Sequence, residues 1–156
     1  MPSSPSRLDE LDAAIVALLQ EDGRRPYGEI GEAVGLSEAA ARQRVNRLRE
    51  SGLMRIVAVT DPVALGRGVV VTIGLRVTGD TREAAARLAQ ISEIEYVVAT
   101  AGSFDVLAEL VCATEEELLG VLNDVRSIPE VRELETFLHL RTEKNVFAWG
   151  QRLTEE

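Results

Sequence analysis

Side chains able to bind nucleic acid recur at helical spacing between residues 37 and 47. The candidates for contact with double-stranded DNA are Ser37, Ala39, Arg42, Gln43, Asn46 and Arg47. All but the first fall opposite Ala41, Val45 and Leu48 at 100° per residue, on the outer face of an amphipathic helix. Arginine can bind a guanine edge with two hydrogen bonds, and asparagine or glutamine can bind adenine in the same way. The pattern predicts a helix that enters the major groove, although an ordinary solvated face has the same appearance.

The residues before this helix have the features of a helix-turn-helix. A short run with apolar Ile30 and Val34 ends at Gly35, which can adopt the left-handed conformation common at helix ends. Ser37 follows and can cap the next helix through its hydroxyl. Two helices joined in this way, the second with a polar outer face, are typical of DNA-binding domains.

Three further segments complete the predicted N-terminal domain. Residues 8–22 carry apolar side chains at helical spacing and predict a helix that covers the inner face of the other two. Residues 53–60 are rich in β-branched side chains and predict a small strand, the wing of a winged helix-turn-helix. Residues 1–7, rich in Pro and Ser, are expected to form a disordered tail.

Charge is unevenly distributed along the chain. The 156 residues have a net charge of -9, but residues 42–55 contain five arginines and one acid, Glu50, for a local net charge of +4. A focused basic patch on an acidic protein favours phosphate contact at one place. The arginines are Arg42, Arg44, Arg47, Arg49 and Arg55. Arg44 lies nearer the buried flank, where it can either brace the helices or touch phosphate.

The remaining composition predicts a cytoplasmic protein without a resident cofactor or metal. The single Cys112 permits no internal disulfide and no cysteine-based zinc site. No apolar run is long enough to span a membrane, and residues 1–7 have no hydrophobic signal core. The sequence contains no nucleophile elbow, phosphate loop or dinucleotide fingerprint.

From residue 69 onward, strands and helices alternate. Predicted strands lie at residues 69–77, 94–101, 104–112 and 131–140, with a hairpin at Gly102 and Ser103. Asp80 with Glu83, and Thr114 with Glu117, have the spacing of capping boxes at two helix starts. The order predicts a ferredoxin-like βαββαβ domain with both helices on one face of a four-stranded sheet.

The uncovered face of this sheet implies a partner. Both faces are apolar, since Leu107 and Val111 alternate with Val106 and Leu110. An exposed apolar face favours association, and a second copy would give a two-fold homodimer with two reading helices for palindromic half-sites. The predicted fold is α+β, with a three-helix winged helix-turn-helix domain at 1–60, a linker at 61–68 and the ferredoxin-like domain at 69–156.

From Leu8 to about Lys144 the chain resembles the Lrp/AsnC, or feast/famine, family of transcriptional regulators. The markers are Leu8, Asp9, Asp12, Asp22-Gly23-Arg24, Gly35-Leu36-Ser37, Arg44, Arg47-Leu48, Gly52 and the hairpin Gly102-Ser103-Phe104-Asp105. The resemblance implies DNA binding through the helix-turn-helix, a RAM/ACT-like C-terminal domain, and dimers that can assemble into octamers. It also implies modulation by an amino acid or a related small molecule.

The same resemblance places an effector site near the hairpin and the fourth strand. Gly102 and Ser103 would supply backbone amides to the effector carboxylate, Asp105 would hold its ammonium group, and Thr136 would donate a hydroxyl hydrogen bond. A structural alternative for Asp105 is a carboxylate that accepts backbone hydrogen bonds at the hairpin end.

The sequence departs from the family pattern near this site. Ala101 stands where the family usually has Thr, Phe104 where it has Tyr, and Leu134 where a Thr is often found. The lost hydroxyls imply a more apolar effector, or none.

Two alternatives of other classes compete with a regulator. Sirohaem decarboxylases have a similar architecture, but they rely on histidine and basic residues around a tetrapyrrole, and this chain has the single His139. A lone histidine on a strand is more often a packed residue than a catalytic one, so we expect no enzyme. The other alternative, a ligand-binding module that does not bind DNA, is disfavoured by the polar face of Arg42, Gln43, Asn46 and Arg47.

Overall fold

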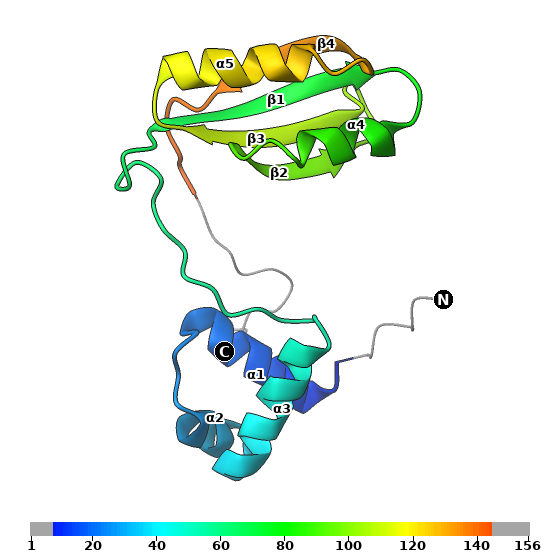
Figure 1. Ribbon diagram of the computed structural model, residues 1–156. Coiled ribbons are helices and arrows are strands. Elements are labelled where there is room, and N and C mark those ends of the chain that lie inside the picture. The colour runs from blue at the N-terminus through cyan, green and yellow to red at the C-terminus, as the bar shows by residue number, and fades with distance from the viewer. Residues whose placement is uncertain (1–7, 145–156) are drawn as a thin grey trace. The chain divides into compact units, whose positions relative to one another are not determined.

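The computed structural model describes residues 8–144, which form two compact units that separate between Ala58 and Val59 (Figure 1). The first unit contains three helices, α1 (Glu10–Glu21), α2 (Tyr27–Val34) and α3 (Glu38–Glu50). The predicted tail at 1–7 lies outside the described residues, as do residues 145–156 of the predicted second domain. The domain bounds inferred from the sequence stay a prediction.

Local capping sets the ends of these helices. The Asp9 carboxylate accepts a hydrogen bond from the amide of Asp12 at 2.7 Å and caps α1. Gly35 ends α2 in the left-handed conformation, with φ of 72°, and the Ser37 hydroxyl accepts from the amide of Ala40 at 3.2 Å to begin α3. The predicted helix-turn-helix is therefore confirmed. Its core is formed by Ile15, Val16, Leu19, Ile30, Ala41, Val45 and Leu48.

Gly31 lets α2 approach the turn that follows it. A Cβ built on Gly31 would lie 2.6 Å from the carbonyl oxygen of Leu36, closer than real Cβ contacts allow. The amide of Leu36 in turn donates a hydrogen bond to the carbonyl of Gly31 at 2.7 Å. The backbone is thus held close at a position where a side chain does not fit.

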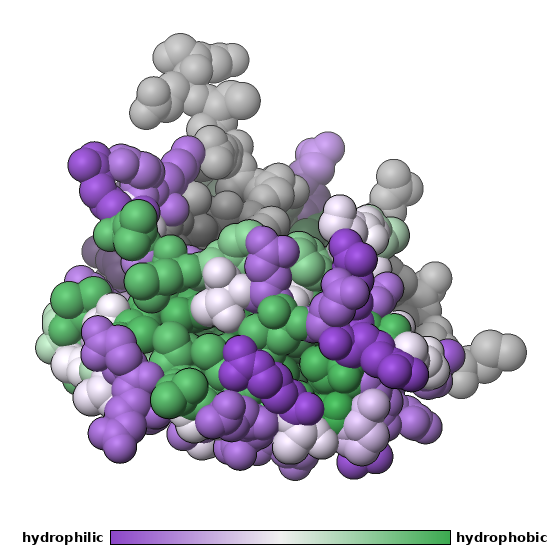
Figure 2. Space-filling model, turned by 90° about the horizontal axis from the view of Figure 1, so that it is seen from above, coloured by the Kyte–Doolittle hydropathy of each residue, from purple (hydrophilic) through white to green (hydrophobic). Residues whose placement is uncertain are grey.

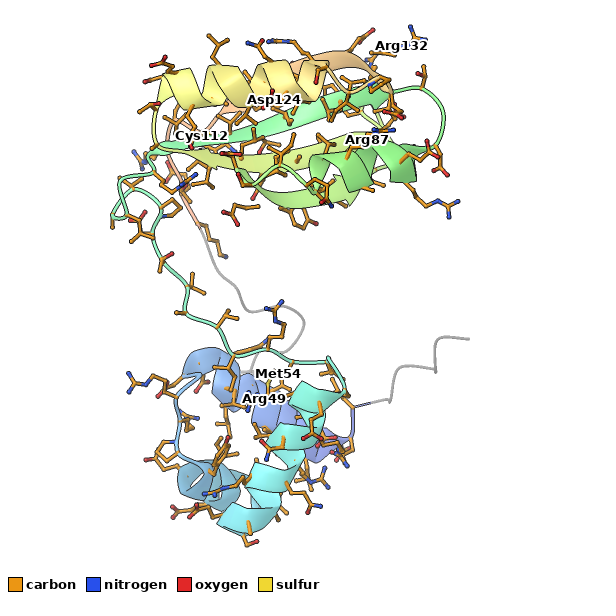
Figure 3. The ribbon with its side chains drawn as sticks, viewed as in Figure 1. Arg49, Met54, Arg87, Cys112, Asp124 and Arg132 are labelled. Atoms are coloured by element: carbon orange, nitrogen blue, oxygen red, sulfur yellow. The ribbon has the colours of Figure 1, made fainter. Side chains whose placement is uncertain are left out.

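The predicted wing is wrong. Residues 53–60 form neither helix nor strand, and the described part of the first unit contains no strand with which this segment could pair. An isolated strand cannot satisfy its backbone groups with ladder hydrogen bonds. Instead, the segment is held by side chains: Met54 packs on the helical core (Figure 3), and Ile56 lies 3.4 Å from the position of a Cβ on Gly23.

The second unit is a four-stranded antiparallel sheet with two helices. In chain order its elements are β1 (Val69–Val77), α4 (Thr81–Leu88), β2 (Ile94–Ala99), β3 (Val106–Cys112), α5 (Glu115–Arg126) and β4 (Val131–Leu138). The strands lie in the order β2-β3-β1-β4, so the predicted βαββαβ order is confirmed.

The two predicted capping boxes have different outcomes. At α5 the Thr114 hydroxyl accepts from the amide of Glu117 at 3.1 Å, and the Glu117 carboxylate accepts from the amide of Ala113. At α4 the Asp80 carboxylate accepts from the amide of Arg82 instead of that of Glu83. The cap at α4 is confirmed, but its partner is one residue earlier than predicted.

The helices cover one face of the sheet and leave the other face open. Leu88 of α4 and Val121 and Val125 of α5 pack in one core with the buried side chains of β1 and β3. Register places Leu107 opposite Val98 on the open face. From above, on the side of α5 and β4, apolar residues lie among charged ones (Figure 2), and the exposed large ones in these two elements are Leu119, Phe137 and Leu138.

A phenylalanine pair covers a glycine of β1. A Cβ on Gly74 would meet the ring of Phe104 at 2.8 Å, and this ring meets Phe137 edge-on with centroids 6.0 Å apart. The family departure from Tyr to Phe at 104 therefore places an apolar ring against the sheet.

Replacement of Gly31 by alanine is expected to destabilise the first unit by about 2 kcal/mol, the usual effect of overpacking a closely packed site. Urea unfolding of the full chain, followed by circular dichroism, measures this loss. Gly28→Ala on the same helix is the matched control, because the nearest atom to its Cβ is a Glu38 carboxylate oxygen at 3.8 Å. Equal stabilities for the two variants would contradict the close approach at Gly31.

Candidate functional site

Of the six residues predicted to contact DNA, five lie on the outer face of α3 and Ser37 is its N-cap. Each is exposed: Ser37, Ala39, Arg42, Gln43, Asn46 and Arg47. The Ser37 hydroxyl accepts the capping hydrogen bond. At this position a DNA phosphate would therefore be attracted mainly by the positive N-terminus of α3. The exposed centre of the face is formed by Ala39, Gln43 and Asn46, and an arginine lies on each side.

Arg42 contacts Glu38 of its own helix and Tyr27 of α2. Its Nη2 lies 2.7 Å from the Glu38 Oε1, and its guanidinium carbon lies 5.2 Å from the centre of the Tyr27 ring. Sequence reasoning missed Glu38 and Tyr27. The i,i+4 spacing of Glu38 and Arg42 was a signal for the first contact, whereas the second joins two helices and has no signature in the sequence.

Arg44 and Arg47 are held from the side of α1. Arg44 Nη1 lies 2.6 Å from Asp9 Oδ2 and 2.7 Å from Asp12 Oδ1, and Arg47 Nη2 lies 2.6 Å from Asp12 Oδ2. Asp12 is buried, and each of its two carboxylate oxygens is paired with a different arginine of α3. Of the two roles considered for Arg44, bracing is the one these contacts support. Arg47 keeps 59% of its side chain exposed and can still reach DNA.

These pairs change the electrostatics of the interface. The hydrogen bond from Arg44, followed by that from the Asp12 amide, lowers the pKa of Asp9 below its ordinary value of 3.8. Asp9, Asp12 and Glu38 place three negative charges beside Arg42, Arg44 and Arg47, three of the five arginines in residues 42–55. The local charge of +4 thus falls to +1, and non-specific attraction to phosphate weakens accordingly.

The hairpin between β2 and β3 brings three of the four predicted effector residues together. The Asp105 amide donates to the Leu75 carbonyl at 2.9 Å, and its Oδ2 accepts from the Val77 amide at 2.9 Å. The Ser103 carbonyl accepts from Arg76 Nε at 2.9 Å, and Gly102 is exposed. One Asp105 oxygen therefore has the structural role considered as an alternative.

Thr136 lies apart from the hairpin. Register pairs it with Ile73 of β1, two residues from Leu75 and on the face of the sheet that the helices cover. Its side chain is exposed at the edge strand β4. The structure thus groups Gly102, Ser103 and Asp105 at the end of the sheet and leaves Thr136 farther along it.

The remaining reactive side chains form no further site in the part of the chain that the structure describes. His139 Nε2 lies 2.8 Å from the Thr72 hydroxyl. Cys112 is buried at the end of β3 (Figure 3), and burial raises the pKa of its thiol. Within residues 8–144, no group of three or more potential metal ligands occurs.

None of the helices between residues 8 and 144 has the length and apolar character of a membrane span.

Family models match both parts of the sequence. Residues 8–49 match an AsnC-type helix-turn-helix domain. Residues 68–152 match a C-terminal dimeric alpha+beta barrel domain.

Individual proteins are similar over nearly the whole chain. The HTH-type transcriptional regulator FL11 of Pyrococcus horikoshii is 37% identical over 139 residues, which cover 88% of this chain and 92% of FL11. The structure of AsnC from E. coli has a TM-score of 0.77 at 25% identity and covers 88% of this chain and 95% of that one. A Neisseria meningitidis transcriptional regulator in complex with L-Met has a TM-score of 0.79 at 26% identity, with 90% and 94% covered.

Acid is expected to weaken the Asp9–Arg44 contact. Because the pKa of Asp9 is lowered in the folded state, its charge stabilises the fold fully above the unfolded pKa, and this stabilisation is lost as the pH falls through the lowered value. The difference in unfolding free energy between wild type and Asp9→Asn should thus be constant near neutral pH and shrink below pH 3.8. Asparagine still caps the helix, so the charge alone is tested.

Urea unfolding at each pH measures this difference, with Glu10→Gln as the control. Glu10 is exposed in the first turn of the same helix. A difference for Asp9→Asn that does not change with pH would contradict the assignment.

Proposed function

We propose, for a chain that belongs to the Lrp/AsnC family of transcriptional regulators, that α3 reads operator DNA through Arg42, Gln43, Asn46 and Arg47. The chain is a helix-turn-helix DNA-binding regulator of this family. The observation that supports the residue assignment is the exposed face of α3, whose polar side chains are those that hydrogen-bond base edges.

Each residue of the face has a role in this proposal. Gln43 and Asn46, at the exposed centre, are suited to adenine, and Arg42 and Arg47 to guanine or to phosphate. Ser37 and Ala39 lie at the start of the helix, where backbone amides and a small side chain allow a strand of the duplex to approach. In this arrangement the outer face of α3, from its first turn to Arg47, lies in the major groove.

The regulator is proposed to act as a homodimer through the open sheet face. That face carries Leu107 and Val98, and its Tyr96 is 55% exposed, as expected for a surface that a second copy covers. The description of the matching C-terminal domain as dimeric agrees with this. Two copies then supply one reading helix to each half-site. We also propose that four such dimers can assemble into an octamer.

The second unit is proposed to sense an amino acid or a related small molecule at the hairpin. Gly102, Ser103 and Asp105 lie together there, and the similar Neisseria meningitidis regulator is in complex with L-Met. Asp105 has one oxygen bound to the Val77 amide, which leaves the other for an ammonium group. We place the protein in the cytoplasm, where a DNA-binding regulator acts.

An enzymatic role is not part of the proposal. Relatives that match over most of the chain, FL11 among them, are named as transcriptional regulators, and the single histidine, His139, lies 2.8 Å from the Thr72 hydroxyl. A tetrapyrrole enzyme would need several basic groups around one cavity.

Loss of both arginines from the reading face is expected to abolish operator binding. Each base contact of this kind contributes about 1–3 kcal/mol, so Arg42→Ala with Arg47→Ala should weaken affinity for the selected operator about a hundredfold or more. Gel-shift titration at fixed salt measures the change. Arg82→Ala, which removes an exposed arginine from α4, is the control.

Sedimentation velocity on the same samples tests the assembly. Wild type and the double variant should both sediment as dimers or octamers at micromolar concentration, because the sheet face is unchanged. A monomer would contradict the proposed interface, and unchanged operator affinity of the double variant would contradict the proposed contacts.

A ligand that binds the hairpin should raise thermal stability. At one hundred times its dissociation constant it adds about 2.7 kcal/mol to the folded state. Thermal-shift measurements against the twenty amino acids, with L-Met among them, should reveal such a ligand, and Asp105→Asn should reduce its shift. Glu109→Gln, on a strand of the same sheet, is the matched control. If no amino acid shifts the transition, this class of effector is wrong.

A further inference from the structure

We infer that Glu38 and Tyr27 are specificity-determining residues, which hold Arg42 in the orientation from which the free edge of its guanidinium reads a guanine. The inference rests on the proposed contact of Arg42 with DNA and extends it to two residues outside the predicted reading set. The three side chains come from the first turn of α2 and the first two turns of α3.

Glu38 places a negative charge on a face that is proposed to approach the negatively charged phosphates of DNA, which by itself would weaken binding. Its side chain is 58% exposed and that of Arg42 is 57% exposed, and their atoms are 2.7 Å apart. A pair this exposed contributes little to stability, while its negative charge repels the DNA backbone. The pair is therefore better explained by what it does to the arginine than by what it adds to the fold.

The contacts leave the binding edge of Arg42 available. The guanidinium is planar and has five N–H donors. Glu38 Oε1 takes a donor of Nη2, and the Tyr27 ring lies against the group at 5.2 Å. A cation over a ring uses its face and leaves its in-plane donors free. A donor of Nη1 and the remaining donor of Nη2 can then meet the O6 and N7 atoms of a guanine.

If the Arg42 side chain is already oriented before DNA binds, binding to the operator sequence is favoured over binding to other DNA sequences. A mobile arginine loses conformational entropy on binding, and a side chain already fixed by two contacts loses less. An arginine with these two contacts is also less free to turn to a nearby phosphate when the guanine is missing. The carboxylate beside it also weakens binding to DNA of any sequence, since it opposes phosphate attraction. Both effects widen the gap between specific and non-specific affinity.

Substitutions that remove each contact test this inference. The probes are the duplex that the wild-type protein selects from a random-sequence pool, and a series in which each G·C pair of that duplex is replaced in turn by A·T. For wild type, replacement of the G·C pair that Arg42 reads should lower affinity about tenfold or more. For Arg42→Ala, replacement of the same pair should have no such effect. In Glu38→Gln and Tyr27→Leu this discrimination should fall about tenfold, whereas Tyr27→Phe, which keeps the ring, should retain it.

Glu50→Gln is the matched control for charge. It removes an exposed acid from the last turn of the same helix, so it should raise affinity for every duplex alike and leave discrimination unchanged. Circular dichroism melting of each variant verifies that the helices remain folded. Equal behaviour of Glu38→Gln and Glu50→Gln, or of Tyr27→Leu and Tyr27→Phe, would overturn the inference.

The experiment separates failure of the inference from failure of the proposed contacts. If Arg42→Ala loses discrimination at one G·C pair while Glu38→Gln and Tyr27→Leu keep it, Arg42 reads DNA without their help and only the inference falls. If Arg42→Ala discriminates at every pair as wild type does, the proposed contact of Arg42 is wrong, and the inference falls with it.

Discussion

The helical unit depends on one carboxylate, that of Asp12. The residue is 5% exposed, and its two oxygens are bound by two arginines of α3. A buried carboxylate without partners would be strongly unfavourable, so α1 and α3 must keep the spacing at which both pairs form. The apolar core supplies most of the attraction between the helices. The ion pairs fix the position of α1 along α3, because a displacement of one helix along the other would leave the Asp12 carboxylate unpaired.

This register of α1 and α3 also positions the side chains at the edge of the surface proposed to contact DNA. Asp12 holds Arg47 on one side of the exposed face of α3, and Glu38 with Tyr27 holds Arg42 on the other. The acids that fix the arginines also neutralise part of their charge. The interface is therefore suited to selective contact at a few positions more than to general attraction to phosphate.

In the second unit, the sheet takes the organising role. Its helix-covered face forms a core, and its open face is the one proposed to bind a second copy. The hairpin is tied to β1 by the backbone and carboxylate of Asp105, while Phe104 lies over Gly74 on the open face. Three of the four candidate effector residues, Gly102, Ser103 and Asp105, thus lie in the same loop as Phe104, which covers part of the open face. A ligand at the hairpin would act close to the surface through which copies associate.

Local features of the sequence were enough to predict most of the architecture. Gly35, Ser37 and the apolar spacing predicted the helix-turn-helix, and alternation predicted the strands, because turns, caps and periodicity depend on neighbours a few residues apart. The wing failed because a strand needs a partner strand, which no local pattern supplies. Tertiary structure alone decided that Asp12 pairs with Arg44 and Arg47, since it lies 32 and 35 positions from them in the chain. It likewise decided that Asp105 binds Val77 and that Phe104 covers Gly74, because such contacts depend on how distant segments pack.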